Sequence, residues 1–73
     1  MKKDAIILFH SSNHAMWTKD ILTEKSIMNK LIPVPRELSS DCGYCVKINS
    51  DDIVQVENLI KENNIEYDKI VEI

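Results

Sequence analysis

The chain alternates short β-type segments with two segments of helical periodicity, and this order limits the folds open to it. Strands are expected at residues 5–10, 31–34, 43–48 and 65–73, and helices at about 13–27 and from about 51 to 62. The order β-α-β-β-α-β is that of the ferredoxin-like unit. With right-handed crossovers it predicts an α+β fold: a four-stranded antiparallel sheet, strands one and three central, and both helices on one face. The 73 residues suffice for a single domain, residues 1–73.

Local signals mark the ends of these elements. Ser11 and Ser12 are candidate N-caps for the first helix, and Ser50 for the second. Asn63-Asn64 can adopt the left-handed turn that ends a helix. Pro33 lies inside the second strand and cannot donate to a ladder hydrogen bond. The second strand is therefore expected at the edge of the sheet.

Composition excludes several classes of function. The net charge is −3 and no basic stripe is visible, so nucleic acid is not an expected ligand. The apolar run near the N-terminus is too short for a signal peptide, and no stretch could span a membrane. A cytoplasmic protein is expected, in which the two cysteines are thiols. No cofactor is expected.

Two features raise the question of self-association. The first strand is apolar on both faces, although the helices of such a fold cover only one. On the first helix, Trp17, Ile21 and Met28 form one stripe while Ala15 and Leu22 form another. The first stripe either wraps the edge of the core or forms the surface of a homo-oligomer.

The predicted topology gathers reactive side chains at one edge of the sheet. This edge contains the end of strand one, the start of helix one, the loop between strands two and three, and the start of strand three. The polar residues expected there are His10, Ser11, Ser12, His14, Arg36, Ser39, Ser40 and Cys42.

Cys42 is the candidate for chemistry at this edge. A helix N-terminus and a cation such as Arg36 both favour the thiolate, which is the nucleophilic form of cysteine. Gly43 permits backbone turns that a side chain would forbid and leaves the sulfur accessible, while Pro33 and Pro35 stiffen the entry to the loop. Cys45, on the third strand, is expected to be a small buried hydrophobe.

Cys42-Gly43-Tyr44-Cys45 also spells a C-x-x-C sequence. In an extended strand the two Cα atoms would lie roughly 10 Å apart, too far for joint chemistry without a turn at Gly43. With such a turn, His10, His14, Cys42 and Cys45 could form a zinc site, which is the less favoured alternative.

The sequence also resembles a known family. The resemblance is carried by Phe9-x-Ser11, Ala15-Met16, Leu31-Ile32-Pro33-x-Pro35-Arg36 and Ser39-Ser40-x-Cys42-Gly43, and it extends over nearly the whole chain. These residues are similar to those of the selenium/sulfur carrier protein-like family, a group of small bacterial proteins. Met16 stands where leucine is usual, Ser26 where a helix-ending glycine is common, and Cys45 is outside the pattern.

The resemblance implies a carrier rather than a turnover enzyme. Cys42 would be the carrier thiol, with Arg36, Ser39, Ser40 and Gly43 as its motif neighbours, and donor and acceptor proteins of sulfur or selenium would be the partners. The alternative from another class is a non-catalytic binding or assembly module, for example a small-ligand sensor. Hydrolase or transferase motifs are not found in the sequence.

Overall fold

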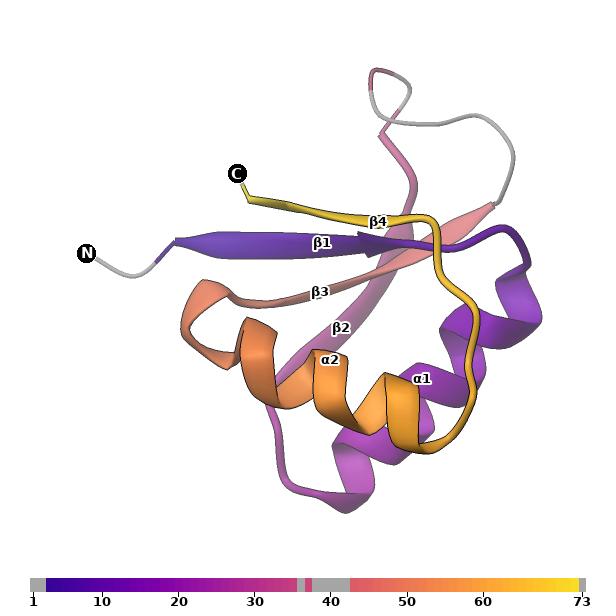
Figure 1. Cartoon of the computed structure of the whole chain (residues 1–73). Helices are drawn as coiled ribbons and strands as arrows, with labels where there is room; N and C mark the ends of the chain where they lie inside the picture. Colours follow the sequence, from indigo (N-terminus) through magenta and orange to yellow (C-terminus); the bar gives the residue numbers. More distant parts are fainter. Residues whose placement is uncertain (1–2, 36, 38–42, 73) are drawn as a thin grey trace.

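The computed structural model has the predicted order of strands and helices, and the α+β ferredoxin-like arrangement is confirmed (Figure 1). It describes residues 3–35, 37 and 43–72. The elements are β1 (Asp4–Leu8), α1 (Ser12–Glu24), β2 (Asn29–Pro33), β3 (Tyr44–Asn49), a 3-10 turn (Ser50–Asp52), α2 (Ile53–Glu62) and β4 (Lys69–Glu72).

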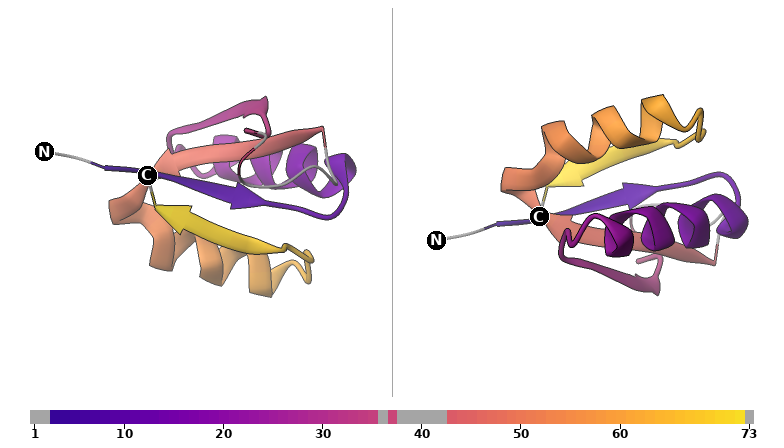
Figure 2. Two further views of the ribbon diagram at one scale, coloured as in Figure 1. Left: turned by 90° about the horizontal axis from the view of Figure 1, so that it is seen from above. Right: turned by 90° about the horizontal axis from the view of Figure 1, so that it is seen from below.

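The four strands form one antiparallel sheet in the order β2-β3-β1-β4. The strands β1 and β3 are central, as predicted. The strand β2 lies at the edge and ends at Pro33, which is where a residue without a backbone N–H can be tolerated. Both helices lie on the same side of the sheet (Figures 1 and 2).

The main core lies between the sheet and the two helices. Alternate residues of β1 and β3 point into it, since side chains along a strand alternate between its faces. Its buried members are Ala5, Ile7, Phe9, Ala15, Leu22, Ile27, Val46, Ile48, Val56, Ile60 and Ile65. Burial of this set supplies the main driving force for folding.

The opposite face of the sheet carries a second apolar cluster. Ile6, Leu8 and Cys45 are its buried members, with Ile32, Val34 and Val71 packed against them. Ile6 is only 2% exposed within the single chain. The apolar second face of β1 therefore needs no partner chain to be buried, which removes the first of the two reasons for expecting a homo-oligomer.

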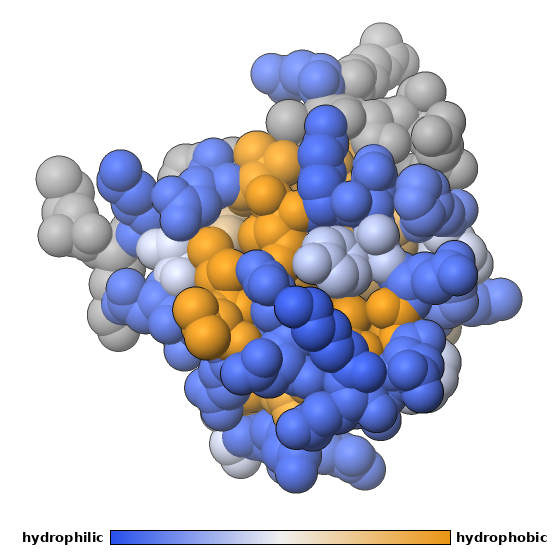
Figure 3. Space-filling model, viewed as in Figure 1, coloured by the Kyte–Doolittle hydropathy of each residue, from blue (hydrophilic) through white to orange (hydrophobic). Residues whose placement is uncertain are grey.

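The helix α1 buries Ala15, Thr18 and Leu22 but leaves part of its other stripe in solvent. Ile21 packs against the main core, whereas Trp17 is 46% exposed and Met28, beyond the end of the helix, is 71% exposed. The predicted stripe is thus divided between core and surface. In the view of Figure 3, the apolar side chains form patches interrupted by polar ones.

The helix α1 ends at Glu24, three residues earlier than predicted. Ser26 adopts the left-handed conformation, with φ 59°, and the N–H of Ile27 donates to the carbonyl of Leu22 at 2.9 Å. This is the hydrogen-bond pattern of a helix that closes on a residue usually occupied by glycine. The stop follows from Ser26, which the sequence had placed inside the helix.

The second helix begins and ends by different means. Ser50 does not cap it but opens the 3-10 turn, and its N–H donates to the carbonyl of Lys3 at 2.9 Å. Asn64 has φ 55° and confirms the predicted left-handed turn at Asn63-Asn64. The strand β4 begins at Lys69 rather than at residue 65, because Ile65 turns into the main core before the chain reaches the sheet.

Within the described residues, no helix has both the length and the apolar character needed to cross a membrane.

Candidate functional site

The described part of the predicted site lies at one end of the sheet, here called the Gly43 edge: residues 9–14, 34–35 and 43–44. Antiparallel pairing of Ile7 with Val46 brings the end of β1 beside the start of β3. The N–H of Val34 donates to the carbonyl of Gly43 at 3.4 Å, which joins the end of β2 to the same place. The predicted convergence of these segments is confirmed for these residues (Figure 2).

Four of the five predicted carrier-site residues, Arg36, Ser39, Ser40 and Cys42, lie outside the described residues. Their roles remain predictions.

Gly43 is described, and it is exposed immediately before the start of β3. A Cβ atom built on it would have no heavy atom within 4 Å among the described residues, its chain neighbours aside. The predicted turn at Gly43 involves Cys42, which lies outside the described residues, and it stays a prediction.

Cys45 lies on β3 and is completely buried, with 0% exposure. It packs beside Ile6 and Leu8 in the cluster on the helix-free face, and its Sγ lies 3.9 Å from the carbonyl oxygen of Pro33. The prediction that Cys45 is a buried small hydrophobe is confirmed. A thiol in this position cannot meet a partner protein while the sheet is folded.

The start of α1 supplies the remaining polar groups of the edge. The Ser11 Oγ accepts a hydrogen bond from the Asn13 N–H at 3.2 Å, which confirms Ser11 as the N-cap. The carbonyl of Ser11 accepts from the N–H groups of His14 and Ala15. Ser11 thus satisfies three of the amides at the start of the helix. Any anion at this edge would depend on the helix dipole more than on those N–H groups.

The two histidines differ in their surroundings. His10 is exposed, whereas His14 is half-buried and its Nδ1 lies inside without a hydrogen-bond partner among the described residues. One turn further along α1, the buried Thr18 Oγ1 also has no hydrogen-bond partner among the described residues. Buried polar atoms without a hydrogen-bond partner cost stability and are uncommon in folded proteins. Of the two histidines, His14 is therefore the one whose surroundings are unusual. Thr18 was not singled out from the sequence, where it looks like an ordinary helix residue.

No group of three or more His, Cys, Asp or Glu side chains within residues 3–35, 37 and 43–72 is arranged to hold a metal ion. The alternative zinc set of His10, His14, Cys42 and Cys45 includes a residue outside that range and stays a prediction. Of its described members, Cys45 is buried in an apolar cluster and His10 is exposed.

The family comparison bears on the whole chain. The model of the family described as "Putative Se/S carrier protein-like" matches residues 4–72. The chain belongs to this family. No curated protein and no solved structure matches it significantly. The match runs from the first residue of β1 to the last residue of β4, so the family corresponds to the complete sheet and both helices.

Proposed function

We propose that this member of the Se/S carrier family carries sulfur or selenium on Cys42. The observation that supports the assignment best is the complete burial of Cys45. The chain has two cysteines, and a carrier thiol must reach the thiol groups of its partners. With Cys45 enclosed in the sheet, Cys42 is the cysteine that can serve.

The transfer step follows thiol–disulfide exchange. The Cys42 thiolate attacks the terminal sulfur of a persulfide on a donor protein, and a new S–S bond forms at Cys42 while the S–S bond of the donor breaks. The donor cysteine leaves as a thiolate. The terminal sulfur keeps its proton, so Cys42 becomes a persulfide and no external oxidant or reductant is consumed. An acceptor thiolate removes the sulfur by the same exchange.

The surroundings of Cys42 are proposed to favour its thiolate. Arg36 would supply a positive charge, and Ser39 and Ser40 would donate hydrogen bonds to the anion. The helix α1 starts at the same edge, so its dipole would add a positive potential there. In this scheme the protein passes a group between partners in the cytoplasm and is not a turnover enzyme.

Intact mass measurement tests this proposal. The protein is incubated with a cysteine desulfurase and cysteine, together with the variants Cys42→Ser and Cys45→Ala. The wild-type protein and Cys45→Ala are expected to gain the mass of one sulfur atom, reversibly with a reductant, and Cys42→Ser is expected to gain none. Circular dichroism checks that each variant is folded. Loading of a folded Cys42→Ser protein, or no loading of the wild type, would contradict the proposal.

A further inference from the structure

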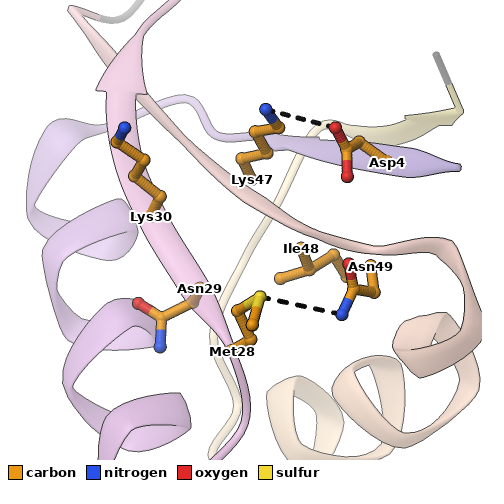
Figure 4. Close-up of a pocket in the computed structure, with 7 residues that line it drawn as sticks. All are labelled: Asp4, Met28, Asn29, Lys30, Lys47, Ile48 and Asn49. Atoms are coloured by element: carbon orange, nitrogen blue, oxygen red, sulfur yellow. Dashed lines mark hydrogen bonds and ion pairs between the residues drawn. The ribbon is translucent and has the colours of Figure 1, made fainter. Parts of the chain in front are cut away.

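A pocket of about 260 Å³ opens at the end of the sheet opposite the Gly43 edge (Figure 4). It is slightly smaller than the usual range of ligand pockets, about 300–1,000 Å³, and therefore suits a small molecule. Its lining comes from the starts of β1 and β2 and the end of β3. The lining residues are Asp4, Met28, Asn29, Lys30, Lys47, Ile48 and Asn49.

Two lysines lie side by side at the rim of this pocket, and in Figure 4 their ammonium groups point away from each other. Lys30 and Lys47 are direct partners in the register of β2 and β3, so they lie on the same face of the sheet. Like charges directly opposite one another destabilise a sheet. Asp4 forms an ion pair with Lys47, its carboxylate lying 3.2 Å from the Lys47 Nζ. In the described part of the chain Lys30 has no such partner, which leaves one positive charge uncompensated in a protein of net charge −3.

The two asparagines of the lining differ in the hydrogen bonds that their side-chain amides make. The Asn29 amide donates to the carbonyl of Ile27 at 2.9 Å and to the Thr23 hydroxyl at 3.3 Å, so it is turned away toward α1. The Asn49 amide donates only to the thioether sulfur of Met28, at 3.8 Å, among the described residues. A sulfur acceptor is weak, and a better acceptor could replace it. Met28, which is 71% exposed, supplies apolar surface, whereas the Ile48 side chain belongs to the main core.

We infer that this pocket binds a small organic anion, an apolar body carrying one carboxylate or phosphate group. The anionic group would pair with the ammonium group of Lys30, while the apolar body contacts Met28 and the aliphatic parts of Lys30 and Lys47. Lysine binds carboxylate and phosphate as a point charge, so the same arrangement suits either group. The pocket lies at the end of the sheet opposite the Gly43 edge, and its lining includes none of the predicted carrier-site residues.

NMR titration of the ¹⁵N-labelled full chain tests the inference. The probes are benzoate and phenyl phosphate, with benzyl alcohol as the neutral probe. At least one anion is expected to shift the amide signals of residues 28–30 and 47–49 saturably, and benzyl alcohol is expected to bind more weakly. Whichever of benzoate and phenyl phosphate binds more tightly identifies the preferred group.

Three charge variants sharpen the test. Lys30→Gln is expected to weaken anion binding about fivefold, the scale of one partly exposed ionic contact. Asp4→Asn frees Lys47 from its ion pair and is expected to tighten binding about threefold. The matched control is Lys69→Gln on β4, outside the pocket lining, which should leave the affinity unchanged. Absence of saturable shifts with both anions, equal binding of benzyl alcohol, or unchanged affinity in Lys30→Gln would overturn the inference.

Discussion

The cluster on the helix-free face of the sheet should contribute to stability as a true core. Ile6 is 2% exposed there, and Ile6→Ala would remove three carbon atoms from it. At about 0.8 kcal/mol per buried methylene, the lost transfer free energy is about 2.4 kcal/mol. The cavity left behind adds to this, and measured Ile→Ala losses in cores are about 2–5 kcal/mol. We expect a loss of about 3 kcal/mol in the free energy of unfolding.

Urea denaturation followed by far-UV circular dichroism measures this loss. A domain of 73 residues is expected to be stable by about 4–11 kcal/mol, so the midpoint should fall markedly. Val54→Ala, at a helix position that is 73% exposed, is the control and should change stability by less than about 0.5 kcal/mol. The midpoints should be independent of protein concentration. A loss below about 1 kcal/mol in Ile6→Ala, or a wild-type midpoint that rises with concentration, would show that this face is not closed within one chain.

Four further predictions follow from single contacts. Ser11→Ala should cost about 1 kcal/mol by removing the N-cap of α1, whereas Ser12→Ala, one residue later and exposed, should be nearly neutral in the same denaturation assay. Ser26→Gly should stabilise by about 0.5–1 kcal/mol, because φ 59° is strained for serine and not for glycine; an unchanged midpoint would argue against that conformation. Lys30→Gln should leave stability unchanged or raise it by a few tenths of a kcal/mol, since it relieves the repulsion with Lys47; a clear loss would mean that Lys30 has a structural role. Cys45 should resist alkylation in buffer and react in concentrated urea, as judged by the mass of Cys42→Ser, and rapid labelling in buffer would contradict its burial.

The order of elements and the edge position of β2 could be predicted because local signals and topology agreed. The apolar runs marked the central strands, Pro33 marked the edge, and Ser11 marked the start of α1. The end of α1 was placed three residues too late because serine is not itself a helix-stop signal, although Ser26 stands where a helix-ending glycine is common in the family and adopts the conformation typical of glycine. Ser50 was misassigned because a 3-10 turn precedes α2.

The site was only partly predictable. Convergence of the segments at the Gly43 edge followed from the strand order, and burial of Cys45 followed from its place in a strand. The part of the site formed by Arg36, Ser39, Ser40 and Cys42 stays a prediction, because these residues lie outside the described ranges. The pocket at the other end was missed because it depends on register. Only pairing of Lys30 with Lys47 brings two residues 17 positions apart to the same point.

The measurement that tests the central claim most directly is the location of the added sulfur in the wild-type protein. After limited loading by a cysteine desulfurase, the persulfide is alkylated and the protein is digested with trypsin. Cleavage after Arg36 and Lys47 releases residues 37–47, which contain both cysteines. Fragmentation of this peptide distinguishes Cys42 from Cys45. The account predicts the extra sulfur on Cys42 alone, and its presence on Cys45 in the folded protein would contradict both the assignment of the carrier thiol and the burial on which it rests.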